Sequence, residues 1–362
     1  MPQFEENTAA TSRWNDEQTH HRVYIVILNW NGWRDTIECL ESVLRLKSQN
    51  IAIVVCDNAS TDGSIERIVA WAHGDLAAPE TPFLQHAAWT KPLPFVRYTR
   101  EAAEYGPAEA TPLALIDTGG NLGFAGGCNV GIRYALTRPD CSHVWLLNND
   151  SVVPPDALAN MMALCRKRPR VGLCGSQVRY YDNPDMVQTF GGLLNPWFCT
   201  THSLSCGAPA MTVTAEPRKI DFVPGASMLV TRAFLQEVGL MSESYFLYFE
   251  EVDWAERAKG RFELAVCLNG LVYHRGAASI GSPTEGGERG ARSEYFLLRG
   301  RVLFARKFYR MRLPVVYLSL IGSIATRLRR GQWTRARIAA CAFAGIRPTM
   351  LNLPKLPVGT AS

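Results

Sequence analysis

The start of the sequence contains one pattern twice: an apolar run, a polar turn and an amphipathic stretch. Residues 23–28 are uninterruptedly apolar and lead to Asn29, and residues 35–46 then place apolar side chains at helical spacing. The same order returns in residues 51–56, 57–62 and 64–72. Apolar runs without alternation are typical of strands buried on both faces. Two such units in about 50 residues predict an α/β fold with parallel strands and right-handed crossovers.

The pattern continues along the chain with one interruption. Residues 74–111 are rich in proline and alanine, which indicates a surface insertion with one short strand at 95–98. A short strand, a glycine-rich loop and a helix from about Cys128 follow, and then a strand ending in "WLLNND". From Val171 the strands become shorter and the loops longer, with a turn expected at Asn269–Gly270. We interpret this part as the second half of the same domain.

Composition limits the class of protein. With 362 residues, 47% of them hydrophobic and 20% charged, the chain suits one large or two medium globular domains. Its ten cysteines lack metal-ligand or disulfide spacing, which indicates reduced cytosolic thiols. Residues 1–20 are polar and are expected to form a disordered tail. The longest apolar run, 314–326, falls short of the ~20 residues that span a bilayer, so no transmembrane helix is predicted.

The charge is distributed unevenly. The net charge is only +5, but Arg and Lys crowd residues 289–347, whereas the acids lie mostly before Glu294. Residues 294–362 are therefore expected to form basic amphipathic helices that meet an anionic surface, either nucleic acid or a membrane leaflet. The alternatives are that these helices only cover the rest of the fold or make an oligomer contact.

Polar side chains follow the first two predicted strands. Asn29 and Asn31 come after the first strand, and Asp57 and Asn58 come after the second. Ligands of parallel sheets bind beyond the carboxyl ends of the strands, where an acid commonly bonds the ribose or base of a nucleotide. The alternative is that Asp57 only shapes a turn before the next helix.

The stretch "GGNLGFAGGCNVG" contains six glycines between positions 119 and 131. Glycines allow backbone N–H groups to approach phosphates closely at a helix N-terminus. The spacing matches neither the dinucleotide fingerprint nor a Walker loop. Tight packing of the backbone is the alternative explanation.

Three acids begin a predicted helix in "YFLYFEEVDWAERA". Glu250, Glu251 and Asp253 stand among aromatic residues, which raise the pKa of a carboxyl group and suit it to act as a general base. Glu250 and Asp253 share a helix face, and Glu251 is turned about 100° away, so spacing alone does not choose between them. A favourable interaction with the helix dipole is the alternative for one or two of these acids.

Six motifs resemble those of the family 2 glycosyltransferases, in the same order. They are "VILNWNG", "VVCDNASTDGS", "NLGFAGGCNVGI", "WLLNNDSVV", "FVPGASMLVTR" and "YFLYFEEVDWAER". The resemblance covers roughly residues 23–306 and is strongest to the bacterial rhamnosyltransferase-like branch. It implies a GT-A fold over residues 21–293, with a mostly parallel central sheet flanked by helices and a C-terminal helical extension. It also implies an inverting transfer of sugar from a nucleotide diphosphate donor.

The resemblance assigns roles to individual residues. The nucleoside would be held by Asn29, Asn31, Asp57 and Asn58, and the nucleotide-sugar site would be lined by Asn121, Gly123, Gly127, Asn129 and Asn148. A divalent cation would be bound by Asp150 and His274, and the leaving diphosphate would be contacted by Arg299. Glu251 is the favoured base, with Asp253 second, although the family's usual Glu-Asp pair is Glu-Glu here.

The implied cofactor is Mg²⁺ or Mn²⁺, and the implied donor is dTDP-rhamnose or a UDP-sugar. The acceptor would be a glycan or lipid-linked sugar of the cell envelope, met at the inner face of the cytoplasmic membrane, and no nucleic acid is involved. A nucleotidyltransferase is disfavoured, because the first loop, "NWNGWRD", is not the Gly-rich, basic loop that a triphosphate needs. A non-catalytic scaffold with this fold is the remaining alternative.

Overall fold

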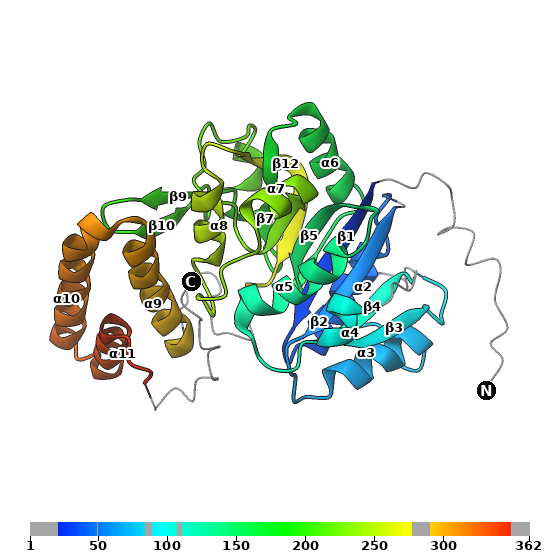
Figure 1. Cartoon of the computed structure of the whole chain (residues 1–362), viewed down its shortest axis with the longest axis horizontal. Helices are drawn as coiled ribbons and strands as arrows, with labels where there is room; N and C mark the ends of the chain where they lie inside the picture. Colours follow the sequence, from blue (N-terminus) through cyan, green and yellow to red (C-terminus); the bar gives the residue numbers. More distant parts are fainter. Residues whose placement is uncertain (1–20, 49, 84–88, 107–110, 277–289, 349–362) are drawn as a thin grey trace.

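The computed structural model describes residues 21–48, 50–83, 89–106, 111–276 and 290–348. The expected tail at 1–20 and the last part of the expected C-terminal region lie outside these residues. A mixed sheet forms the centre, helices flank it, and three further helices stand together at one end (Figure 1). The predicted architecture, a mostly parallel sheet with a C-terminal helical region, is confirmed.

Twelve strands occur in the described residues. They are β1 (Arg22–Asn29), β2 (Ile51–Asp57), β3 (Phe95–Thr99), β4 (Leu113–Asp117), β5 (Cys141–Asn148), β6 (Ser151–Val152), β7 (Val171–Tyr180), β8 (Val187–Thr189), β9 (Gly192–Asn195), β10 (Thr200–Ser203), β11 (Ser227–Thr231) and β12 (Glu263–His274). The central sheet has the order β3-β4-β2-β1-β5-β11-β7-β12-β6, with β8 paired to β7, and β9–β10 form a separate hairpin. Strands β1 to β5 are parallel, and β11 enters antiparallel between β5 and β7.

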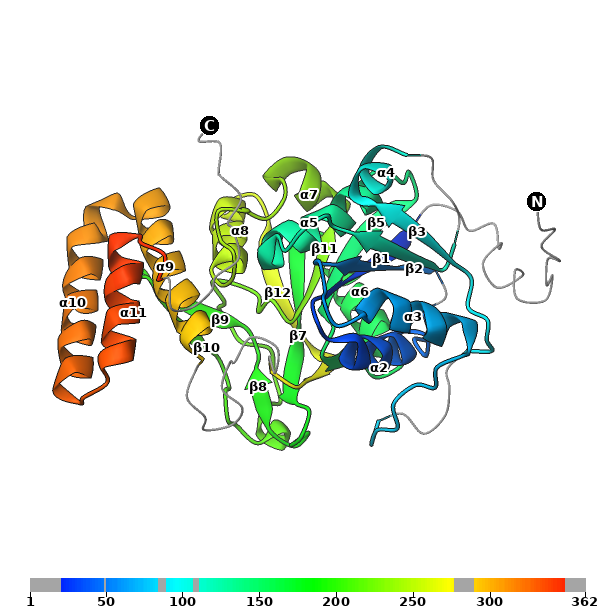
Figure 2. The ribbon, with the colours of Figure 1, turned by 90° about the horizontal axis from the view of Figure 1, so that it is seen from below.

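Helices cover both faces of the sheet because the strands are apolar on both sides. The helices are α2 (Trp33–Val43), α3 (Ser64–His73), α4 (Arg100–Tyr105), α5 (Gly123–Leu136), α6 (Ala157–Lys167), α7 (Arg232–Val238), α8 (Glu250–Ala258), α9 (Ala291–Phe308), α10 (Leu313–Arg329) and α11 (Trp333–Ala344), with 3-10 turns η1 (Ala210–Thr212) and η2 (Arg310–Arg312). Ile25 and Ile27 of β1 pack with residues of α2, α3 and α6, whereas Val26 packs with α5 and α7. Figure 2 shows α2 and α3 on one side of the sheet and α5 and α7 on the other.

The segment 74–111, expected to be a surface insertion, contributes a strand and a helix to the fold. Strand β3 pairs in parallel with β4 at the sheet edge, and α4 follows it with Ala103 fully buried. An edge strand is only partly buried, so "FVRYT" lacks the apolar run that marks the inner strands.

Two expected boundaries differ because glycine serves packing in this chain. Helix α5 begins at Gly123 rather than near Cys128, since a Cβ on Gly127 would lie 2.3 Å from Leu28 Cδ1. The turn expected at Asn269–Gly270 is instead an irregularity inside the continuous strand β12. A Cβ at Gly270 would approach Met161 Cγ to 2.7 Å, which explains a glycine inside a strand.

The C-terminal helices pack on α8 rather than on the sheet. Val302 and Phe304 of α9 join Phe249 and Val252 in one core, to which α10 adds Val316 and Leu320. The stretch Arg310–Arg329 is the one helix in the described residues that is long and apolar enough to cross a membrane, by length and composition only. This differs from the expectation, which considered an apolar run of only 13 residues, because η2 and α10 together form a 20-residue helical stretch with its arginines at the two ends.

Candidate functional site

The ends of β1 and β2 are joined by a buried hydrogen-bond network. Asn29 Nδ2 donates to Asp57 Oδ1 at 2.6 Å, and both residues are at most 5% exposed. The Thr36 hydroxyl donates to Asn29 Oδ1 at 2.7 Å. Asn31 has a positive φ of 51°, and its Oδ1 accepts from the backbone N–H of Thr61 at 2.7 Å. The network holds the two strand-end loops in one fixed arrangement.

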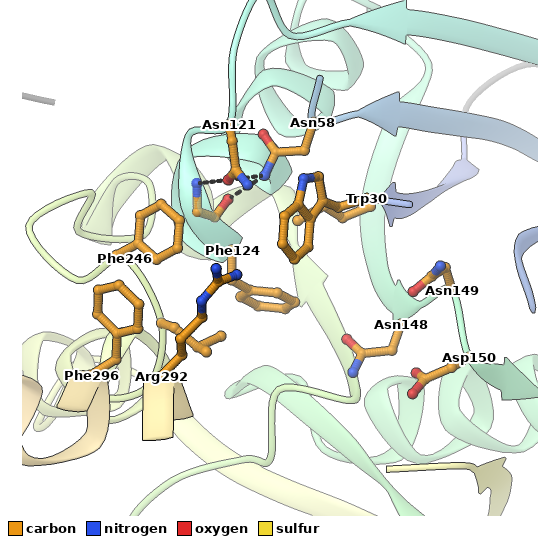
Figure 3. A pocket seen from close by; sticks show the side chains of 13 residues that line it. Trp30, Asn58, Asn121, Phe124, Asn148, Asn149, Asp150, Phe246, Arg292 and Phe296 are labelled. Atoms are coloured by element: carbon orange, nitrogen blue, oxygen red, sulfur yellow. Dashed lines mark hydrogen bonds between the residues drawn. The ribbon is translucent and has the colours of Figure 1, made fainter. Parts of the chain in front are cut away.

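A pocket opens beside this network, at the carboxyl ends of the strands (Figure 3). Its lining comes from loops after β1, β2 and β5, from the start of α5, from the loop before α8 and from α9. The lining residues are Leu28, Trp30, Asn58, Asn121, Gly123, Phe124, Asn148, Asn149, Asp150, Phe246, Leu247, Arg292 and Phe296. Figure 3 shows Phe246, Phe296 and Arg292 on one side of the pocket, Asn148 and Asp150 on the other, and Trp30 and Phe124 between them.

Amide groups and a tight backbone approach form one wall of the pocket. Asn58 Nδ2 donates to Asn121 Oδ1 at 3.1 Å and to the Gly123 carbonyl at 3.2 Å. Gly123 has a φ of +74°, and a Cβ there would lie 2.3 Å from the Phe246 carbonyl oxygen. Only glycine fits this position, because a side chain would separate the start of α5 from the loop before α8.

Asp150 and His274 are brought together at the other side of the pocket. Asp150 Oδ1 and His274 Nε2 are 3.1 Å apart, and Asn148 Nδ2 is also 3.1 Å from that nitrogen. The other ring nitrogen, Nδ1, lies 2.6 Å from Gln188 Oε1, which can only accept a hydrogen bond. Nδ1 therefore carries a proton, and in a neutral ring the Nε2 lone pair faces the Asp150 carboxylate. A cation between these two groups would relieve their repulsion, so the pair fits a divalent metal.

The candidate metal site has two charged or imidazole ligands from the described residues, Asp150 and His274. Within the described part of the chain, no third His, Cys, Asp or Glu joins Asp150 and His274 in a metal-binding group. Oxygen ligands from a bound diphosphate would fit the remaining positions, because Mg²⁺ and related cations are commonly shared with substrate phosphates.

At the start of α8, Glu250 is buried and Glu251 is half-buried, and one oxygen of each side chain is shielded from solvent. Glu250 Oε2 and Glu251 Oε2 have no hydrogen-bond partner within the described residues. Burial raises the pKa of Glu251 to about 7, although backbone N–H groups at the start of α8 lower it in part. Burial and the neighbouring Glu251 charge raise the pKa of Glu250 well above its usual range. Tyr248 and Phe249, which precede them, have φ values of 66° and 73°, a strained conformation for aromatic residues.

Asp253, the second predicted base, is engaged elsewhere. It is fully buried, and its carboxylate pairs with Arg257 Nε at 2.7 Å and with Lys307 Nζ at 2.6 Å. The Tyr245 hydroxyl donates to Asp253 Oδ2 at 3.1 Å. These contacts make Asp253 a link between α8 and α9 rather than a group that can accept a proton from a substrate.

Several other predicted residues do not line the pocket. Asn129 bonds the Met241 carbonyl and Glu243, and Gly127 packs on Leu28. Asp57 lines a separate polar cavity with Arg97 and Asp117, and Arg299 points toward Gly345 at the end of α11. The arginine that lines the pocket is Arg292, about two helical turns before the predicted Arg299.

Sequence reasoning missed Trp30, Phe124, Phe296, Arg292 and Gln188. Trp30 stands between Asn29 and Asn31, and an aromatic side chain inside a polar strand-end loop is the signal that marks it. Gln188 and Arg292 have no comparable signal, since each is placed by contacts between distant segments.

The sequence is similar to those of known glycosyltransferases. The family model described as "Glycosyl transferase family 2" matches residues 24–78 and 97–197. A Haloferax volcanii protein, "Low-salt glycan biosynthesis hexosyltransferase Agl10", is 26% identical over 153 residues, 40% of this chain and 45% of that protein. A Mycobacterium tuberculosis "N-acetylglucosaminyl-diphospho-decaprenol L-rhamnosyltransferase" is 25% identical over 208 residues, 49% of this chain and 67% of that protein. The match thus spans less than half of the first of these relatives.

Solved structures share the fold at low sequence identity. "GalNAc-T7 with UDP, GalNAc and Mn2+" has a TM-score of 0.54 at 13% identity, covering 83% of this chain and 50% of that one. A mannosyltransferase of Pyrobaculum calidifontis, in complex with GDP-Man and Mn²⁺, has a TM-score of 0.50 at 16% identity, covering 92% and 89%. The family model thus covers strands that build the pocket but less than half of the chain, and the solved transferases share the fold.

Proposed function

We propose that this protein transfers a sugar from a nucleotide diphosphate donor to an acceptor hydroxyl with inversion at the anomeric carbon. The observation that carries the proposal is that Asp150, paired with His274, lines the same pocket as Trp30, the Asn58–Asn121 amides and Arg292. One pocket thus combines groups for a nucleobase, a diphosphate and a cation. Glu251 follows the pocket residue Leu247 by four positions, and one of its oxygens has no hydrogen-bond partner in the described residues, which a binding scaffold would not need.

Each group has a chemical part in this proposal. The Trp30 ring stacks on the base, and the Asn58 and Asn121 amides bond the nucleoside, while Asn29, Asn31 and Asp57 hold the loops. Arg292 contacts the diphosphate through charge-assisted hydrogen bonds. Asp150 and His274 would hold Mg²⁺ or Mn²⁺, which when bound would neutralise charge on the leaving diphosphate. The Asn148 side chain, at the end of β5, orients the His274 ring at the end of β12.

Glu251 serves as the general base. It accepts the proton of the acceptor hydroxyl while that oxygen attacks the anomeric carbon, and the bond from that carbon to the diphosphate breaks. The products are the glycosylated acceptor and the nucleoside diphosphate. A pKa of about 7 leaves a substantial fraction of Glu251 ionised at neutral pH and makes it a stronger base than an ordinary carboxylate.

Donor and acceptor follow from the relatives. The mycobacterial relative is named for L-rhamnose and a diphospho-decaprenol acceptor, and the Haloferax relative for glycan biosynthesis. We therefore propose dTDP-rhamnose as the first donor to test, with UDP-sugars next. The proposed acceptor is a lipid-linked or envelope glycan, reached from the cytoplasm at the inner face of the membrane.

Release of nucleoside diphosphate from a panel of nucleotide sugars with Mn²⁺ tests the proposal. We expect one donor to be turned over, and Glu251→Gln and Asp150→Ala to abolish that turnover. Glu237→Gln, an exposed glutamate on α7, is the matched control and should keep full activity. Donor binding without turnover, even with candidate acceptors present, would favour a scaffold instead.

A further inference from the structure

The outer face of α10 is an exposed apolar stripe. Met311 is 93% exposed, Leu318 68%, Ile321 51% and Leu328 39%. With the exposed Pro314 and Ala325, these residues recur at spacings of three and four, so they lie along one side of a continuous helical stretch. The opposite side of the helix is in the core, where Val316 and Leu320 are fully buried.

Exposed aromatic residues lie near both ends of α10. Trp197 is 59% exposed and Phe198 42%, both in the turn of the β9–β10 hairpin. The Arg312 guanidinium lies 4.7 Å from the Trp197 ring, and Arg301 Nε donates to the Phe198 carbonyl, so the hairpin lies against the bundle. Figures 1 and 2 both show β9 and β10 beside α9 at this end of the molecule. Trp333, 70% exposed, follows the other end of α10. We call these exposed residues the α10 patch: Trp197, Phe198, Met311, Leu318, Ile321, Leu328 and Trp333.

The segment that contains most of the patch carries only positive charge. Residues 310–347 contain eight arginines and no acidic residue. Arg327 and Arg335 pair with Glu294 of α9, and the others include Arg310 and Arg312 at one end of α10 and Arg329 and Arg330 at the other. A second copy docked along α10 would place arginine against arginine in either orientation. A partner surface that is both apolar and anionic therefore fits the patch.

The packing of α10 favours a position parallel to a membrane surface over a spanning one. Leu320 and Val316 are held in the core with Val302 and Phe304, and Arg301 Nη2 bonds the Ser319 hydroxyl at mid-helix. A helix that crossed the bilayer would have to leave these contacts and expose the buried arginine to lipid.

We propose that the α10 patch docks on the anionic leaflet of a lipid bilayer, with α10 lying in the interface and its apolar side chains inserted below the headgroups. Tryptophan is favoured at this depth, and the arginines at both helix ends meet the lipid phosphates. The patch belongs to the bundle whose first helix, α9, supplies Arg292 and Phe296 to the pocket. Docking there keeps the pocket close to the membrane surface, where a lipid-linked acceptor is presented.

Vesicle flotation of the full chain tests the proposal without any donor or acceptor, so its result is independent of the transferase activity. We expect binding to vesicles containing phosphatidylglycerol, weak binding to pure phosphatidylcholine, and loss of binding as salt is raised. The double variant Leu318→Glu, Ile321→Glu should reduce the affinity at least about tenfold, because two inserted side chains are replaced by anions. Circular dichroism of the variant checks that the helices remain folded.

Met211→Glu is the matched control, since Met211 is 86% exposed on η1, outside the patch. It should bind vesicles as the parent does. Absence of binding by the parent, or equal binding by the double variant, would overturn the proposal. A dimer that dissociates in the double variant, seen by analytical ultracentrifugation, would assign the patch to a second copy instead. Parent protein that resists extraction from vesicles by alkaline carbonate would indicate a spanning helix and also overturn it.

Discussion

Asp150 and His274 meet because the short strand β6 pairs with the end of β12. Ser151 is the register partner of His274, so the residue before β6 and the last residue of β12 lie side by side, with Asp150 Oδ1 and His274 Nε2 3.1 Å apart. The Arg275 backbone N–H donates to the Asp150 carbonyl at 3.1 Å and fixes the same junction. The two candidate metal ligands are thus positioned by backbone pairing rather than by flexible loops.

Removing either ligand should weaken cation binding. We expect Asp150→Asn and His274→Ala to raise the Kd for Mn²⁺, measured by electron paramagnetic resonance with a nucleoside diphosphate present, by at least about tenfold. Asn148→Asp should keep or strengthen binding, because it adds a carboxylate beside His274. Equal loss in Asn148→Asp and Asp150→Asn would show that the amide and the acid do not have these separate roles.

The pH dependence of turnover should report Glu251. Since its pKa is raised to about 7, the ionised base accumulates as pH rises, and kcat/KM should climb through about pH 7 and then level off. Glu251→Gln should lose this rise along with most of the activity, by about 10²–10⁴-fold. A rise centred near 4.5, the usual value for glutamate, would contradict burial of the acting carboxyl group.

The same raised pKa has a consequence for stability. In the window from about 4.5 to about 7 the folded protein binds more protons at Glu251 than the unfolded chain does, so the free energy of unfolding falls as pH rises through it. Glu251→Gln should therefore melt at a higher temperature than the parent at pH 8, and the difference should shrink toward pH 4. Thermal unfolding followed by circular dichroism measures both. A variant less stable than the parent at pH 8 would mean that an ionised Glu251 is stabilised in the fold.

Asp253→Asn should affect stability rather than chemistry. The substitution weakens two ion pairs at a fully buried carboxylate, and we expect the free energy of unfolding to fall by about 2–4 kcal/mol. Glu237→Gln, on an exposed surface, should change it by no more than about 0.5 kcal/mol. A variant with unchanged stability but with the turnover loss of Glu251→Gln would return the role of base to Asp253.

The sequence predicted the sheet well because both of its faces are buried. Strands such as β1 and β2 need long apolar runs, and these are visible without any knowledge of contacts. The edge strand β3 was predicted at residues 95–98, but the short helix α4 after it was not, and the start of α5 was misplaced because its glycines serve packing. Local pattern also located Asp150, whereas Gln188 and Arg292 come from segments that only the fold brings to the site.

The choice between Arg292 and Arg299 shows the limit of spacing on a single helix. Both arginines are on α9, but Arg292 lines the pocket, whereas Arg299 Nη1 is buried without a hydrogen-bond partner in the described residues and lies 3.1 Å from the Cβ position of Gly345. Burial lowers the pKa of Arg299, as expected for a charge taken from water without an acid beside it. The resemblance that assigned Arg299 to the diphosphate therefore does not identify the arginine that lines the pocket.

Matched variants on this helix decide which arginine acts. Arg292→Met should raise the KM for the nucleotide sugar by about 10–100-fold, because a charge-assisted hydrogen bond to the diphosphate is lost. Arg299→Met should change that KM by less than about twofold. It should also leave the protein at least as stable, because methionine fills similar space without a buried unpaired charge. Kinetics at varied nucleotide-sugar concentration give the KM of each variant. Isothermal titration gives its affinity for the nucleoside diphosphate, and thermal unfolding gives its stability. Weaker nucleotide binding in Arg299→Met with Arg292→Met unchanged would reverse the assignment and require α9 to rotate on donor binding.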